Sequence, residues 1–140
     1  MFLFRRRGVD RTRLRIVRTF YQSFIQQNGP EARARRLLRE WLSPDQCAQF
    51  DANDYFEVTG CHTGRRYRVH YGTMSNVVEV DASGLPVIGW CFVPDRTTLA
   101  AGDVMLAQKI ALETDEAAVL ALAHRFSPRM SRLRVVRPAY

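Results

Sequence analysis

YFEVTGCHTGRRYRVHYGTMSNVVEV, residues 55–80, is the stretch of sequence that determines the fold. Along most of it apolar and polar side chains alternate, which is the pattern of a β-strand with one buried face. Residues 61–64 and 72–75 interrupt the alternation with Gly, Ser and Thr, which are typical of turns. A fourth apolar run, PVIGWCFV, follows at 86–93. The sequence therefore predicts four strands that pair in chain order as an antiparallel meander, at 55–59, 65–71, 76–80 and 86–93.

The two turns also predict a pairing register for the sheet. With turns at 61–64 and 72–75, Arg68 lies opposite Glu57 in the first hairpin and opposite Glu79 in the second. Opposite charges that face each other on neighbouring strands stabilise a sheet by roughly 0.2–1 kcal/mol per pair. We therefore expect Glu57, Arg68 and Glu79 to form structural ion pairs rather than a surface that binds phosphate.

The same register gathers the apolar residues on the opposite face of the sheet. It also places Arg66 opposite Asp81, and Ile88 of the fourth strand opposite Val78 of the third. A shift of one residue would turn every side chain to the other face, so the register decides which residues are buried. The residues expected in the core, including those from helices, are Leu38, Trp41, Phe56, Val58, Tyr67, Val69, Val78, Ile88, Trp90, Phe92, Leu106 and Ile110.

Helical spacing precedes the strands. Residues 11–27, RTRLRIVRTFYQSFIQQ, place aromatic and aliphatic side chains on one stripe, with Arg11, Arg15 and Arg18 off it. This pattern predicts an amphipathic helix. Pro30 and the pair Ser43-Pro44 are typical helix starts, so two more helices are expected before the first strand.

Helical spacing returns after the strands. Asp103 is the expected cap of a helix over 103–113, and Thr114 is the expected cap of another over 115–126. The predicted fold class is α+β, with a four-stranded antiparallel meander flanked by N-terminal and C-terminal helices. Three segments are expected along the chain: a basic amphipathic N-terminal helix in 1–29, an α+β core domain in 30–127 and a basic C-terminal tail in 128–140.

Positive charge is concentrated at the N-terminus. The chain of 140 residues has a net charge of +7, and residues 1–40 hold 11 arginines against 3 acidic residues, a net +8. Lys109 is the single lysine among 21 basic residues, a bias that is typical of codon usage in a GC-rich genome and argues against assigning a function to every arginine. The candidate residues for binding a partner are Arg5, Arg6, Arg7, Arg11, Arg15, Arg18 and Arg65.

Four interpretations of the arginines stay open from the sequence. They could contact a nucleic acid backbone, an acidic protein surface or an anionic membrane face, or they could form a solvated surface. No helix-turn-helix, zinc-finger or RNA-recognition signature is present, so binding to nucleic acid would be dominated by phosphate contacts and would depend steeply on salt.

Residues suited to catalysis or metal binding are few and scattered. Cys47, Cys61 and Cys91 form no CxxC spacing with one another, and the three histidines form no HxxxH spacing. Phosphate-binding glycine loops and hydrolase motifs are also missing from the sequence. We therefore expect no catalytic residues, no metal and no cofactor. The alternative is a small enzyme or metal-binding protein with its site near Cys61 and His62.

Targeting signals point to the cytoplasm. The apolar residues of MFLFRRR precede its arginines, which is the wrong order for a secretory signal, although an Arg-rich start also occurs in organellar transit peptides. No stretch approaches the ~20 apolar residues of a membrane span. Three unpatterned cysteines are typical of reduced thiols. We expect a cytoplasmic protein without a membrane span.

Five runs of sequence carry a resemblance to other proteins. They are LLREWLSPDQCAQFDANDYFEV (37–58), TGRRYRV (63–69), NVVEVD (76–81), WCFVP (90–94) and GDVMLAQKIALET (102–114). In this order they resemble a group of short uncharacterised proteins encoded in bacterial, chiefly alphaproteobacterial, genomes and by their phages. The resemblance implies a bacterial or phage origin and no mechanism.

The basic N-terminal helix and the lack of catalytic motifs together predict a small non-enzymatic binding or adaptor module that acts through this helix.

Overall fold

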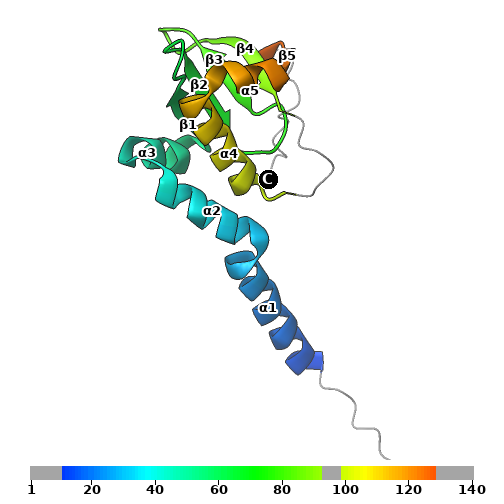
Figure 1. Cartoon of the computed structure of the whole chain (residues 1–140). Coiled ribbons are helices and arrows are strands. Elements are labelled where there is room, and N and C mark those ends of the chain that lie inside the picture. Colours follow the sequence, from blue (N-terminus) through cyan, green and yellow to red (C-terminus); the bar gives the residue numbers. More distant parts are fainter. Residues whose placement is uncertain (1–10, 93–98, 129–140) are drawn as a thin grey trace, which may run out of the picture.

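A computed structural model describes residues 11–92 and 99–128 of the chain. These residues form an α+β fold with one antiparallel sheet and helices at both ends of the sequence (Figure 1). The helices are α1 (Arg11–Asn28), α2 (Pro30–Trp41), α3 (Pro44–Asn53), α4 (Ala101–Thr114) and α5 (Glu116–Leu122). The strands are β1 (Tyr55–Thr59), β2 (Arg66–His70), β3 (Val77–Val80), β4 (Pro86–Cys91) and β5 (His124–Phe126), and they lie in chain order across the sheet.

The hydrophobic core lies between the sheet and the helices. The helix α4 contacts both β1 and β2, and α2 packs along α4. The edge-to-face contact between Phe50 of α3 and Phe56 of β1, with ring centroids 6.1 Å apart, joins α3 to the same core. Fully buried side chains from every one of these elements meet there, namely Leu38, Phe50, Phe56, Tyr67, Val69, Met105 and Leu112.

Local sequence explains where α2 and α3 begin. Pro30 and Pro44 each stand at a helix start, where the missing N–H of proline leaves no hydrogen bond unmade. Ser43 and Gln46 form a reciprocal capping box at the start of α3, because each side chain bonds the backbone of the other residue.

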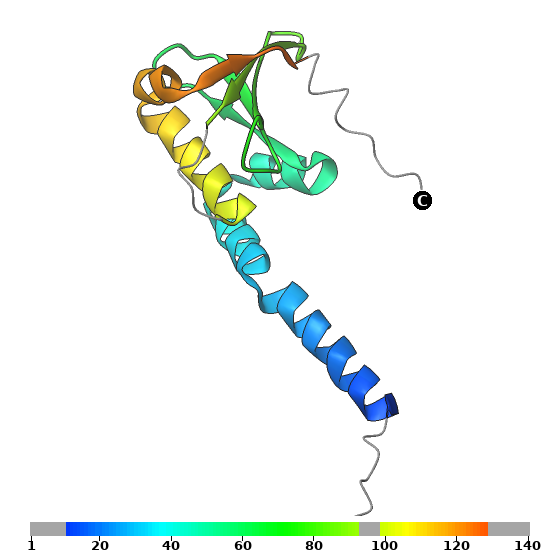
Figure 2. The ribbon, with the colours of Figure 1, turned by 90° about the vertical axis from the view of Figure 1, so that its right-hand side faces the viewer.

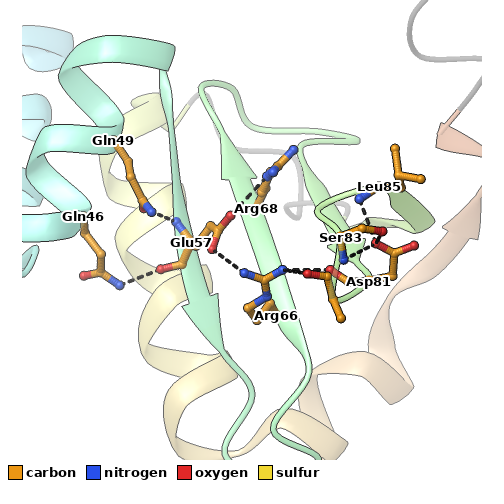
Figure 3. Close-up of polar contacts among 9 residues, drawn as sticks. Gln46, Gln49, Glu57, Arg66, Arg68, Asp81, Ser83 and Leu85 are labelled. Atoms are coloured by element: carbon orange, nitrogen blue, oxygen red, sulfur yellow. Dashed lines mark hydrogen bonds and ion pairs between the residues drawn. The ribbon is translucent and has the colours of Figure 1, made fainter.

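The helix α3 also covers the open edge of the sheet. Its Gln46 Nε2 donates a 2.8 Å hydrogen bond to the Glu57 carbonyl of β1, and the Glu57 N–H donates to Gln49 Oε1 at 2.8 Å (Figure 3). The outward-facing backbone groups of an edge strand are otherwise free to pair with another chain. Two glutamines therefore close β1 against strand addition at Glu57.

The predicted register of the first hairpin is confirmed. Phe56 lies opposite Val69, Glu57 opposite Arg68, and Val58 opposite Tyr67. Phe56, Val58, Tyr67 and Val69 are buried, so one face of this hairpin forms the core as expected.

The predicted register of the second hairpin is wrong by one residue. Arg68 lies opposite Val78, and Glu79 lies opposite Tyr67. The cause is the turn, because the His70 N–H donates to the Asn76 carbonyl at 2.7 Å and leaves five residues, 71–75, in the loop. The Asn76 amide closes this loop with hydrogen bonds to the carbonyls of His70 and Gly72. All four residues of β3 are buried, so its sequence has no clear alternation of apolar and polar residues that would distinguish the two registers.

The shift moves Glu79 from the outer face of the sheet to the core face. Its carboxylate pairs with Arg65 rather than Arg68, with Oε1 3.7 Å from the arginine Nε. Its other oxygen, Oε2, is buried and has no hydrogen-bond partner in the described part of the chain. The expected row Glu57–Arg68–Glu79 is thus reduced to Glu57–Arg68.

The third hairpin also departs from the prediction. Ile88 lies opposite Glu79 rather than Val78, which faces Gly89, and the register shifts at an irregularity between Glu79 and Val80.

The shift in the second hairpin also places Arg66 opposite Val80 rather than Asp81, although its guanidinium still reaches the Asp81 carbonyl at 2.8 Å.

The sheet has five strands where four were predicted. The helix expected over 115–126 ends at Leu122, and His124–Phe126 pairs with β4 as the short edge strand β5. Gly89 explains the pairing, because a Cβ there would lie 2.3 Å from the Phe126 ring. The absence of a side chain at Gly89 lets the Phe126 ring pack against this position of β4.

Two residues predicted for the core are exposed instead. Trp41 of α2 is 59% exposed and Ile110 of α4 is 41% exposed. The buried stripe of α2 is narrower than predicted and consists of Ala34 and Leu38, followed by Leu42 after the helix. The helix starts also differ, because α4 begins at Ala101 with no side-chain cap from Asp103, and α5 is preceded by Asp115 rather than Thr114.

The helix α1 projects away from the rest of the molecule. Two views at right angles show it extending beyond α2, with the sheet and α4 at the opposite end (Figures 1 and 2). Its principal neighbour among the described elements is α2, which it meets at the Asn28–Pro30 junction. The domain therefore presents α1 as an extended arm.

Candidate interaction helix and polar clusters of the sheet

The apolar stripe of α1 is exposed along the helix. Among the side chains of α1 that the structure describes, the large hydrophobic ones are exposed by between 53% and 73%. These residues are Leu14, Ile16, Val17, Phe20, Tyr21 and Phe24. Six such residues on one projecting helix form a contiguous apolar surface, which we call the α1 stripe. Exposed patches of this kind mark sites of interaction.

Arginines flank the α1 stripe. Arg11, Arg15 and Arg18 are exposed, and the helix holds Arg13 as a fourth base and no acidic residue. Arg5, Arg6 and Arg7 lie outside the described residues. The structure thus brings three of the predicted binding arginines onto the helix that carries the exposed stripe.

Arg65 does not belong to that surface. It follows the β1–β2 turn, its side chain is 54% exposed, and it pairs with Glu79. The sheet lies at the far end of the molecule from α1 (Figure 1). Arg65 and the α1 arginines therefore belong to separate surfaces.

Arg66 and Arg68, the two arginines of β2, contact neighbouring residues of the sheet. Glu57 forms ion pairs with both, with its Oε1 3.4 Å from Arg68 Nε and its Oε2 3.5 Å from Arg66 Nη1 (Figure 3). Arg66 also donates to the carbonyls of Asp81 and Ala82, next to a turn that the Asp81 carboxylate closes. Arg68 stacks over the Tyr55 ring at 4.9 Å. These contacts occupy both guanidinium groups within the sheet.

A buried carboxylate joins the β1–β2 turn to α5. Glu116 is 0% exposed, and its Oε2 accepts from the Tyr67 hydroxyl at 2.6 Å and from the Thr63 hydroxyl at 2.7 Å. Its Oε1 accepts from the backbone N–H groups of Thr63, at 2.8 Å, and His62, at 3.1 Å. Gly60 makes room for the group, because a Cβ there would lie 1.9 Å from Oε2.

The environment of Glu116 keeps it ionised. Burial alone would raise its pKa, but the hydrogen bonds from Tyr67, Thr63 and His62 outweigh burial and lower the pKa below 4.5. The pKa of Tyr67 is raised by burial, by its hydrogen bond to Glu116 and by the negative charges of Glu116 and Glu79. At neutral pH Tyr67 therefore donates to an ionised carboxylate, and this bond ties β2 to α5.

Cys61 and His62 cap α5. The Glu116 N–H donates to Cys61 Sγ at 3.4 Å, and the Ala117 N–H donates to His62 Nδ1 at 3.1 Å. The first N–H groups of a helix have no partner within the helix, so these two side chains satisfy donors that would otherwise be unpaired. The alternative site predicted near Cys61 and His62 thus consists of residues engaged in docking the turn onto α5.

No signal in the sequence marked Glu116 as buried. From the sequence alone, Glu116 is an acid in the first turn of the helix over 115–126, where it interacts favourably with the helix dipole. Its partners Tyr67 and Thr63 are about 50 residues away in the chain, as the separations of 49 and 53 positions show. Only the docking of α5 on the β1–β2 turn brings them together.

Neither a metal-binding cluster nor a helix that could span a membrane is found in the described part of the chain. In residues 11–92 and 99–128, no three His, Cys, Asp or Glu side chains lie close enough together to hold a metal ion. Within the same part of the chain, every helix is too short or too polar to cross a bilayer.

Comparisons with other proteins found no match to a protein-family model, a curated protein or a solved structure. The resemblance to short bacterial and phage-encoded proteins therefore stays a prediction.

Proposed function

We propose that this chain is a non-enzymatic, cytoplasmic binding module that uses α1 to bind an acidic protein surface. The observation that carries the proposal is the exposed α1 stripe on a helix that projects from the domain. Most helix stability in proteins comes from packing of an amphipathic face, so a partner that covers the apolar face of this 18-residue helix would stabilise it.

The stripe favours a protein over a nucleic acid. Leu14, Val17, Tyr21 and Phe24 follow the alternating spacing of three and four residues with which a helix packs on another helix. Phosphate groups would engage the arginines and leave these four side chains in water. The arginines that flank the stripe then favour a partner whose surface is apolar where it contacts the stripe and acidic on either side of that contact.

The partner should be helical and negatively charged, so a synthetic probe can test the proposal. The probe is an acidic heptad peptide, with Leu at the a and d positions and Glu at the e and g positions, labelled for fluorescence anisotropy. The variant L14Q/V17Q/Y21Q/F24Q, which we call the stripe variant, should lose binding. The matched control T19A/S23A changes exposed residues outside the stripe and should bind like the wild type.

A labelled 30-base-pair duplex DNA, a random-sequence RNA of similar length and anionic lipid vesicles are measured in parallel. Binding to either nucleic acid that is lost in R11Q/R15Q/R18Q but kept in the stripe variant would replace the protein partner by a phosphate backbone. Such binding would also fall by orders of magnitude between low and moderate salt. Vesicle binding that the stripe variant abolishes, without binding of the acidic peptide, would replace the protein partner by a membrane surface.

A further inference from the structure

A second unpartnered apolar surface lies on α4 and α5. One hollow of about 550 Å³ runs between these helices, and a second of about 300 Å³ continues along α4 toward Leu99. The two share Ala107, Ala111 and Val119 as lining residues, so they form one continuous surface, which we call the α4–α5 groove.

The shape of the groove suits a helix. Its floor contains Ala107, Ala111 and Ala118, whose small side chains let the backbone of a packing helix approach closely. Its rim carries large apolar side chains that are exposed, with Ile110 at 41%, Leu122 at 81% and Leu99 at 46%. The groove therefore offers apolar area that the described part of the chain does not cover.

The charge of the groove is opposite to that of α1. Asp103 and Asp115 are its charged lining residues in the described part of the chain. The helix α1 carries four arginines and no acid. Packing α1 against α1 of another copy would bring like charges together, whereas packing it in the groove brings arginines to aspartates.

The lengths also agree. At 1.5 Å per residue, the 18 residues of α1 span roughly 27 Å and the 14 residues of α4 roughly 21 Å, before α5 extends the groove. Because α1 points away from α4 and α5 of its own chain (Figures 1 and 2), the described conformation leaves the α1 stripe and the α4–α5 groove open to another molecule.

We infer that the acidic surface bound by α1 is the α4–α5 groove of a second copy of this chain. Two chains then exchange their α1 helices reciprocally and form a closed two-fold dimer with two identical helix-in-groove contacts. This inference rests on the proposed function, which requires only that α1 binds an acidic helical surface.

The first test is the mass of the full chain in solution, by size-exclusion chromatography with light scattering across the micromolar range. The wild type should show twice the 16.2 kDa of one chain. The stripe variant should be monomeric, as should A107R/A118R, which fills the groove at two exposed alanines and which we call the groove variant. The matched control A121R changes an exposed alanine of α5 outside the groove and should remain dimeric.

The second test mixes the two monomeric variants. The stripe variant keeps an intact groove and the groove variant keeps an intact α1, so one of the two contacts can form between them. A heterodimer that appears only in the mixture, and binds more weakly than the wild-type dimer, would support the exchange. A wild-type dimer that survives in the groove variant would overturn it, because α1 would then be packing elsewhere.

The acidic heptad peptide separates the two proposals. A monomeric wild type that binds the peptide through the α1 stripe would overturn the dimer and leave the proposed function standing. A monomeric wild type that does not bind the peptide would overturn both. Circular dichroism of every variant is recorded alongside, and the helix content should match that of the wild type because each change is at an exposed position.

Discussion

The Tyr67 hydroxyl donates a 2.6 Å hydrogen bond to Glu116 Oε2 across 49 positions of sequence. This bond joins the second strand of the sheet to the first turn of α5, and both residues are fully buried. Since the β1–β2 turn donates to the same carboxylate, Glu116 is the point through which α5 is attached to the sheet.

Replacing Glu116 by glutamine should destabilise the fold. Glutamine keeps the size of the side chain but removes the charge and one acceptor, so a buried donor of Tyr67 or Thr63 loses its partner. Hydrogen bonds to charged groups contribute about 1.5–3 kcal/mol, and we expect a loss of that order in the free energy of unfolding measured with urea. The matched change Glu113→Gln, at an exposed position of α4, should have an effect below about 0.5 kcal/mol. Equal effects at the two positions would contradict the role assigned to Glu116.

The stabilisation by Glu116 should disappear in acid. The pKa of Glu116 is lower in the folded chain than its ordinary value of 4.5 in the unfolded chain. Between the folded and the unfolded pKa the unfolded state binds more protons, so stability falls as the pH decreases. The difference in unfolding free energy between wild type and E116Q should be complete above pH 4.5 and shrink as the pH falls through the folded pKa. The pKa of His70 is lowered by burial and by Arg68, so protonation of this histidine in the unfolded state also reduces stability as the pH falls, starting at a higher pH than for Glu116. This contribution is the same in wild type and E116Q and cancels in the difference.

Gly60→Ala should be strongly destabilising through the same carboxylate. The added Cβ would overlap Glu116 Oε2, and the hydrogen bonds that hold this carboxylate leave it little freedom to move. The double variant G60A/E116A removes both the Cβ clash and the buried charge, so its destabilisation should be smaller than the sum of the two single changes. Urea unfolding of all four proteins measures this coupling. Simple additivity would show that Gly60 is required for another reason.

Gly89→Ala should detach β5 from the sheet. The alanine Cβ would overlap the Phe126 ring, and the three-residue edge strand is otherwise attached by its pairing with β4 and by Arg125 over the Trp90 ring. Hydrogen–deuterium exchange of 124–126 should accelerate while exchange in β1 and β2 stays unchanged. The control Val87→Ala, at an exposed position of β4, should leave exchange of β5 as in the wild type. Slow exchange in both variants would show that β5 is held by its backbone bonds alone.

Glu79→Leu should leave stability unchanged or raise it. The carboxylate lies on the core face, with one oxygen unpaired among the described residues and the other 3.7 Å from an exposed arginine. Replacing a buried, poorly paired charge by an apolar side chain of similar size is often neutral or stabilising by about 1–4 kcal/mol. The matched change Glu57→Leu breaks the contacts with both Arg66 and Arg68 and should be destabilising. If Glu79→Leu were destabilising and Glu57→Leu were not, the result would contradict this pairing and favour the register in which Glu79 faces Arg68.

The sequence by itself determined the elements that depend on near neighbours. Helix starts at Pro30 and Ser43, the strands β1 to β4 and the register of the first hairpin follow from caps, turns and alternation, which act over a few residues. The amphipathic, arginine-rich character of α1 follows from its spacing in the same way.

Tertiary structure decided the features in which distant residues meet. The five-residue β2–β3 loop shifted a strand that is buried on both faces and moved Glu79 inside, because β3 carries no alternation to select a register. The edge strand β5 exists because Phe126 finds the bare surface of Gly89, and Glu116 is buried because α5 docks on a turn formed by residues more than 50 positions earlier. Exposure of the α1 stripe was likewise decided by packing, since a periodic pattern predicts an apolar face but not whether the same chain covers it.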